Sequence, residues 1–135
     1  MQRLWILLFF VGFAASCEYF DSMDIERNSL EYIVQSSDMT QATITIENYY
    51  RYDGDTSGDY GPAIYAPDGG DPNLPFSLSH DVDLMNNESY YMILNAEISG
   101  TGNIQVIIKN DGVVLCDQSA SGLNAVVECS ARIKH

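Results

Sequence analysis

The chain has 135 residues, of which 46% are hydrophobic and 19% are charged. This length and composition fit one globular domain with a packed core, and they exclude a disordered chain. Six basic residues against 19 acidic ones give a formal net charge of −13, so the chain lacks the clustered Lys and Arg of a nucleic-acid surface.

The first sixteen residues have the three-part pattern of a secretory signal peptide. Arg3 provides the positive start, residues 4–13 form an apolar run, and three small residues follow. The apolar run is too short to cross a bilayer core of roughly 30 Å as a helix. We therefore expect residues 1–16 to be removed on export.

Cys17 follows the small residues directly, and the string Ala14-Ala15-Ser16-Cys17 resembles a bacterial lipobox, whose Cys carries the lipid anchor. Lipidation of Cys17 would leave the other two of the three cysteines as a pair in an oxidising compartment. Two or three acyl chains such as palmitate anchor a protein stably. We expect a lipoprotein of the bacterial cell envelope, facing the periplasm or on the cell surface. Ordinary cleavage after Ser16, giving a free secreted domain, is the alternative.

Residues 17–28 are acidic and lack a wide apolar stripe. This pattern predicts a solvated tether between the anchor and a folded domain over residues 29–135. A strongly acidic domain is repelled by anionic lipid, so the membrane contact is expected to come from the anchor alone.

The remaining sequence is strand-like, with apolar and polar residues in alternation and no convincing helix. Strand patterns cover residues 30–35, 40–50, 76–84, 90–98, 103–109, 113–116 and 124–131. Asp111-Gly112 is a strong hairpin signal between two of these segments. About seven short strands predict an all-β, immunoglobulin-like antiparallel β-sandwich, with a barrel as the alternative.

The stretch that follows the second strand pattern is unusually rich in Asp and Gly. Asp53, Asp55 and Ser57 match the first half of a calcium-binding loop, and Asp59 offers a further oxygen ligand. Ile64 stands where such a loop needs a bidentate acid. We favour a solvated, turn-rich loop, and a calcium site is the alternative.

The same loop, residues 49–73, also carries several tyrosines. Tyr49, Tyr52, Tyr60 and Tyr65 lie beside many hydrogen-bond acceptors. Aromatic rings in such a setting stack on sugars or contact a protein partner. The four tyrosines are therefore candidate ligand-binding residues, although tyrosine is also common in ordinary strands.

Cys116 and Cys129 fall on consecutive predicted strands, and a turn near Gly122 would place them opposite each other. In an exported protein this arrangement predicts a disulfide, and two buried free thiols are the alternative. The chain has no CxxC motif, so the predicted bond is structural rather than redox-active.

Several short motifs follow one another in the second half of the chain: LPFS at 74–77, LNAE at 94–97, SGTG at 99–102, DGVVL at 111–115, SG at 121–122 and AVVECSA at 125–131. Their order and spacing resemble the small mycobacterial membrane protein (MmpS) family. The resemblance implies an exported immunoglobulin-like β-sandwich. It also implies an accessory role beside lipid and siderophore exporters of the resistance–nodulation–division type.

The chain departs from that family in three respects. The family is held by a transmembrane helix, whereas this sequence has a lipobox-like pattern. The usual cysteine partner of the family falls near Val106 here, and this chain offers Cys116 instead. Residues 50–73 look like an insertion. The resemblance therefore bears on fold more than on partner.

Enzyme motifs such as GxSxG, HExxH and a phosphate-binding Gly-rich loop do not occur in the sequence. His80 stands beside Asp81, but neighbouring strand residues point to opposite faces and cannot form a catalytic pair. We expect His80 to be a partly buried structural residue. The sequence predicts a non-catalytic binding or adaptor module with an envelope protein partner, accessory to a membrane transport system. A calcium-dependent or glycan-binding surface lipoprotein is the alternative.

Overall fold

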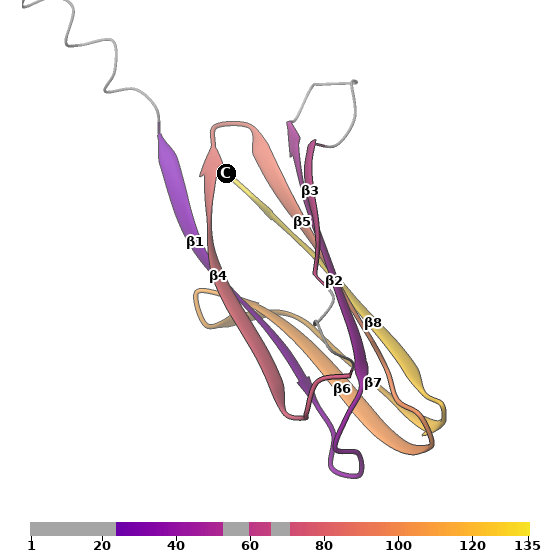
Figure 1. Cartoon of the computed structure of the whole chain (residues 1–135). Helices are drawn as coiled ribbons and strands as arrows, with labels where there is room; N and C mark the ends of the chain where they lie inside the picture. Colours follow the sequence, from indigo (N-terminus) through magenta and orange to yellow (C-terminus); the bar gives the residue numbers. More distant parts are fainter. Residues whose placement is uncertain (1–23, 53–59, 66–70) are drawn as a thin grey trace, which may run out of the picture.

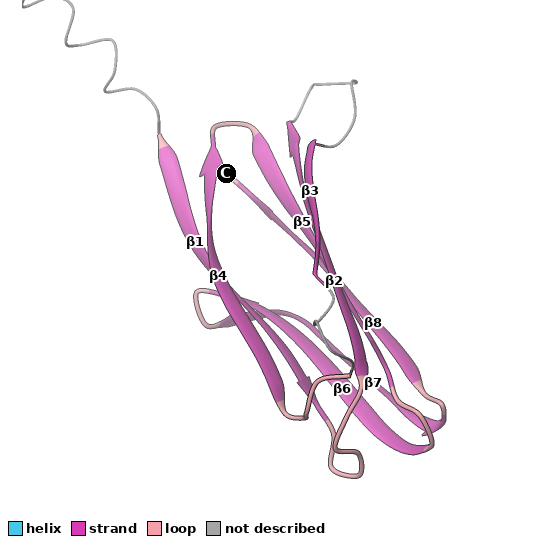
Figure 2. Ribbon diagram, in the orientation of Figure 1, coloured by secondary structure: helices cyan, strands magenta, loops and turns pink. Residues whose placement is uncertain are grey.

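The computed structural model describes residues 24–52 and 71–135 in full and the backbone of residues 60–65. The described chain is all strand and turn, as Figure 2 shows. The strands are β1 (Ile25–Gln35), β2 (Thr43–Tyr52), β3 (Tyr60–Tyr65), β4 (Phe76–Met85), β5 (Glu88–Glu97), β6 (Thr101–Asn110), β7 (Val113–Leu123) and β8 (Val126–Lys134). No helix long and apolar enough to span a bilayer is found in these parts of the chain.

The eight strands form two four-stranded antiparallel sheets that pack face to face (Figure 1). One sheet has the order β4-β1-β6-β7, and the other has the order β3-β2-β5-β8. The predicted antiparallel β-sandwich is therefore confirmed, and the alternative of a single closed barrel is wrong.

The first strand begins earlier than the sequence predicts. Residues 25–28 pair with the end of β4, where Ile25 lies opposite Met85 and Asn28 opposite Val82. The predicted tether over residues 17–28 is thus wrong at its end. The strand was not predicted here because its inward position holds a polar residue, Asn28, rather than an apolar one. Asn28 is only 2% exposed.

The predicted loop over residues 49–73 is also partly wrong. β2 continues to Tyr52, and β3 (Tyr60–Tyr65) pairs with β2 at the edge of its sheet. β3 brings the number of strands to eight rather than about seven. It contains Pro62, which removes one backbone donor and is tolerated because β3 is an edge strand.

The hairpin signal at Asp111-Gly112 is confirmed. Both residues have positive φ, 49° and 79°, and Asn110 pairs directly with Val113 across the turn. Two consecutive residues of positive φ define the turn whose twist matches that of paired strands, and Gly112 adopts this backbone without steric cost.

The core lies between the two inner sheet faces. It is formed by the inward apolar residues of the alternating pattern predicted from the sequence. The largest fully buried side chains come from β1, β2, β4, β5 and β6, with Ile98 just beyond β5. They are Leu30, Tyr32, Val34, Ile44, Ile46, Leu84, Met92, Leu94, Ile98, Ile104, Val106 and Ile108.

The predicted disulfide between Cys116 and Cys129 is confirmed, with the two Cα atoms 5.9 Å apart. Cys116 lies on β7 and Cys129 on β8, which belong to different sheets. The bond therefore joins the two layers at one side of the sandwich.

Candidate functional site

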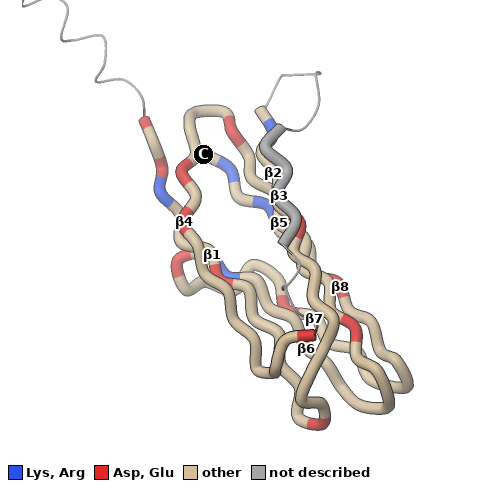
Figure 3. The backbone as a smooth tube through the Cα atoms, viewed as in Figure 1, with Lys and Arg blue, Asp and Glu red and all other residues tan. Residues whose placement is uncertain are grey.

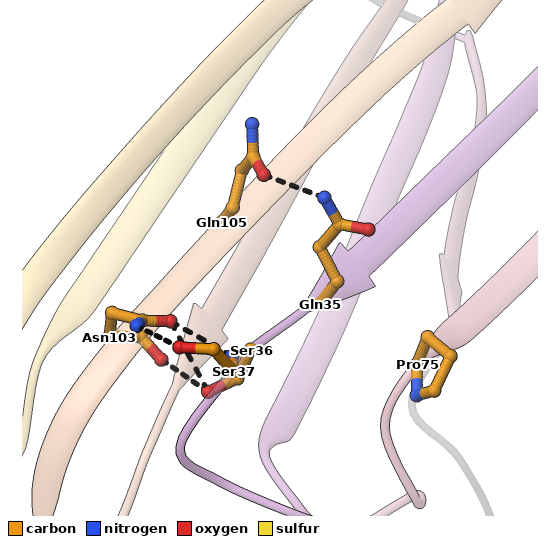
Figure 4. Close-up of a pocket in the computed structure, with 6 residues that line it drawn as sticks. All are labelled: Gln35, Ser36, Ser37, Pro75, Asn103 and Gln105. Atoms are coloured by element: carbon orange, nitrogen blue, oxygen red, sulfur yellow. Dashed lines mark hydrogen bonds between the residues drawn. The ribbon is translucent and has the colours of Figure 1, made fainter.

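A pocket of about 410 Å³ opens at one end of the sheet that contains β1 and β6 (Figure 4). The end of β1, the loop after it, the start of β6 and the residue before β4 supply its walls. The lining residues are Gln35, Ser36, Ser37, Pro75, Asn103 and Gln105.

The first wall of this pocket is a row of side chains that crosses three strands. Gln35 and Gln105 lie opposite each other on β1 and β6, and the Gln35 amide donates to the Gln105 carbonyl oxygen over 2.7 Å. The Gln105 amide in turn donates to the Asp117 carboxylate on β7, also over 2.7 Å. Each glutamine is thereby held in one orientation, which fixes the polar groups that a ligand would meet.

The second wall depends on Asn103. Its amide nitrogen donates to the Ser37 hydroxyl over 2.6 Å and to the Asp38 carboxylate over 2.7 Å. The backbone nitrogen of Ser37 donates back to the Asn103 side-chain oxygen over 3.1 Å. These bonds tie the loop after β1 to the start of β6, so the pocket is preformed.

Gly102 allows this loop to lie close to β6. A Cβ atom at position 102 would fall 2.9 Å from Met39 Cγ, 3.2 Å from Met39 Sδ and 3.3 Å from Asp38 Cβ. A side chain here would push the loop away from Asn103. The glycine therefore maintains the second wall of the pocket.

The pocket suits binding rather than acid–base chemistry. Five of its six lining residues are neutral amides or hydroxyls, and none of the six is a histidine, cysteine or carboxylate. Amides and hydroxyls both donate and accept hydrogen bonds, so they recognise neutral polar ligands such as saccharides or peptide groups. Sequence reasoning missed this site, because the pairing of β1 with β4 and β6 brings its members together.

The tyrosines predicted to bind a ligand are only partly placed. Tyr49 stacks on Tyr91 across β2 and β5, with ring centroids 4.9 Å apart and planes 7° apart. The guanidinium carbon of Arg132 lies 5.3 Å from the centre of the Tyr91 ring. Tyr52 is 43% exposed at the end of β2. The side chains of Tyr60 and Tyr65 lie outside the described residues.

The predicted calcium ligands Asp53, Asp55, Ser57 and Asp59 lie outside the described residues, and so does the predicted lipidation site, Cys17. Over residues 24–52 and 71–135, no group of three or more His, Cys, Asp or Glu is arranged to hold a metal ion.

His80 is confirmed as a partly buried residue of the inner face. Its ring stacks on Tyr32, with centroids 5.6 Å apart, and its Nε2 lies 3.3 Å from the Tyr90 hydroxyl. Burial lowers the pKa of His80, while nearby Asp81 opposes this shift. Burial also raises the pKa of Tyr90 to about 12. The environment favours neutral side chains, which fits a structural role.

Tyr32 and Asn48 complete this buried cluster, and the sequence did not reveal their pairing. The Tyr32 hydroxyl donates to the Asn48 side-chain oxygen over 2.7 Å, with both residues buried. Burial raises the pKa of Tyr32 well above its usual range. The only sequence signal was a polar residue at an inward position of the β2 alternation.

No family model matches this chain, and no curated protein sequence matches it. The resemblance to the small mycobacterial membrane proteins therefore stays a prediction.

Proposed function

We propose that this chain is a lipid-anchored, exported binding or adaptor module without catalytic activity. The preformed pocket lined by neutral amides and hydroxyls is the observation that carries this proposal. Its hydrogen-bonded walls position several donors and acceptors at little cost in conformational entropy on binding. The ligand class that fits these groups is neutral and polar.

Export and anchoring rest on the cysteines and the N-terminal pattern. Cys116 and Cys129 form a disulfide, which favours an oxidising compartment. Cys17 is the remaining cysteine, directly after the signal-like segment. Acylation of Cys17 accounts for all three cysteines. An accessory role beside a membrane transporter rests on the family resemblance alone.

Metabolic labelling with an alkyne analogue of palmitate tests the anchor. The full chain should incorporate the label and partition with membranes, and a Cys17→Ala variant should lose both properties. Equal labelling of the two proteins, or labelling of neither, would refute the lipid anchor.

Photo-crosslinking in the producing cells tests the pocket. A photoreactive amino acid at Gln35 should give a discrete adduct, because Gln35 lines the pocket. The same residue at Ser79, which is exposed on β4 of the same sheet, is the matched control. Identical adducts at both positions, or none at Gln35, would argue against binding at the pocket.

The alternative function is calcium-dependent or glycan binding through the Tyr- and Asp-rich segment of residues 49–73. Titration calorimetry with calcium tests it directly. Heat that disappears in an Asp53→Asn, Asp55→Asn variant would favour this alternative, and the absence of heat would remove its calcium-dependent form.

A further inference from the structure

β7 presents a hydrogen-bonding edge that has no strand partner among the described residues. It pairs with β6 on one side and is the last strand of its sheet. Exposed apolar side chains lie at both of its ends, with Val113 64% and Leu123 73% exposed. Val114 and Leu115 are also exposed, at 52% and 39%. An open, apolar edge of this kind is a template for pairing with another strand.

The other three edges carry features that discourage such pairing. β4 presents Asp81 and Asp83, and Asp83 forms an ion pair with Arg27 at 2.9 Å. β3 contains Pro62, and β8 carries three charged residues. β7 has eleven residues, no proline and a single charge, at Asp117. Charges and prolines are among the usual protections of edge strands, and β7 has one such residue in eleven, the lowest share of the four edges.

The distribution of charge indicates which partner this edge accepts. Residues 101–135 contain three acidic and three basic residues, whereas residues 1–100 contain sixteen acidic and three basic ones. The six charged residues of the neutral part are Lys109, Asp111, Asp117, Glu128, Arg132 and Lys134. Figure 3 colours the charged positions along β6, β7 and β8. Two copies of an acidic protein meet with the least repulsion on this neutral side.

β7 is also complementary to itself in one antiparallel register. If Gln118 lies on a two-fold axis, Val113 of one copy faces Leu123 of the other, and Asp117 faces Ser119. The most exposed apolar residues are then covered twice by symmetry, and no like charges face each other. A register centred on Val114 would instead place Asp111 opposite Asp117. Of these two registers, the sequence of the strand favours the first.

We propose that β7 is a dimerisation edge, on which a second copy of this chain adds its own β7 antiparallel, with Gln118 at the two-fold axis. The two sheets containing β1 then become one continuous eight-stranded sheet across the dimer. Backbone hydrogen bonds hold this interface, and the paired apolar ends of β7 fix its register.

Sedimentation velocity on the full chain in detergent, from about 1 µM to about 1 mM, tests the dimer. The protein should pass from monomer to dimer over this range. Val113→Lys should weaken dimerisation by about tenfold or more, since the change occurs at two symmetry-related contacts. Met85→Lys is the matched control, because Met85 is a 50% exposed apolar residue on β4, and it should leave dimerisation unchanged.

Thiol cross-linking tests the register. Directly opposite residues have Cβ atoms about 5 Å apart, so Gln118→Cys should give a covalent dimer with a short bifunctional maleimide. Ser79→Cys on β4 should give none above the background of the unmodified chain. A purely monomeric protein, a dimer insensitive to Val113→Lys, or equal cross-linking at both positions would each overturn the proposal.

Discussion

The two halves of the sandwich interior differ in that one contains hydrogen-bonded tyrosine and histidine side chains among its buried aliphatic ones. The half nearest the turn between β7 and β8, here called the aliphatic end, is built around Ile44, Leu94 and Val106, which are at most 2% exposed. The other half, here called the aromatic end, is built around Tyr32 and His80, which stack on each other.

The polar atoms of the aromatic end impose a further requirement. Buried tyrosine and histidine side chains need hydrogen-bond partners inside the protein, whereas aliphatic side chains need only close packing. Asn48 meets this need for Tyr32, and the Tyr90 hydroxyl meets it for His80. The aromatic end should therefore depend on hydrogen bonds, and the aliphatic end on packing.

Truncation at the aliphatic end should have the largest effect. Leu94 has no exposed surface, and Leu94→Ala should lower the free energy of unfolding by about 4 kcal/mol through lost burial and a residual cavity. Urea denaturation followed by far-ultraviolet circular dichroism measures this change. Leu123→Ala, the same change at a 73% exposed site, should cost less than about 1 kcal/mol. Equal losses would show that the aliphatic end is not tightly packed.

Removal of the disulfide should have the next largest effect. The bond closes a loop with a sequence separation of 13. Cys116→Ala with Cys129→Ala should therefore lower the free energy of unfolding by about 3 kcal/mol, since the unfolded chain gains conformational freedom. Thermal melting of the oxidised chain and of the double variant measures the difference. An unchanged melting temperature would mean that packing of β7 against β8 alone joins the sheets.

Loss of one hydroxyl should probe the aromatic end. Tyr32→Phe leaves the buried Asn48 oxygen without its donor, and the free energy of unfolding should fall by about 1.5 kcal/mol. Adding Asn48→Leu removes the orphaned group and should recover part of this loss. Tyr91→Phe, on the outer face of the same sandwich, should change stability by less than about 0.5 kcal/mol. Denaturant midpoints at constant slope compare the four proteins.

The fold was largely predictable from sequence, because inward apolar residues alternate with outward polar ones along most strands. The prediction failed where the inward residue is polar. Asn28 faces the interior and accepts a hydrogen bond from the Asn110 amide, so the start of β1 resembled a tether. β3 was missed because Pro62 is rare in strands, and only its edge position permits it.

The candidate site was much less predictable. Gln35, Asn103 and Gln105 are ordinary outward polar residues in the sequence. They become one pocket because β1 and β6 are neighbours in the sheet although 70 residues separate the two glutamines. Local sequence patterns predict which residues share a strand face and where turns fall, as Asp111-Gly112 shows. They do not predict the order of strands in a sheet. A site assembled from strand order is therefore invisible before the topology is known.

The smallest expected effect is the response of the aromatic end to acid. Burial lowers the pKa of His80, so the unfolded chain binds a proton at this residue more readily than the folded one does. The free energy of unfolding should therefore fall as pH drops below the ordinary histidine value of about 6.5, and level off below the folded-state pKa. A His80→Gln variant should lose this part of the pH dependence. Denaturant midpoints of both proteins between about pH 5 and pH 8 provide the comparison.

NMR titration of the His80 ring gives the direction of its pKa shift independently. Because the ring stacks on Tyr32 in a partly buried site, it should be neutral at a pH where an unfolded histidine is half protonated. Parallel pH profiles for the two proteins would show that the aromatic end tolerates a charged ring, and hence that water reaches it.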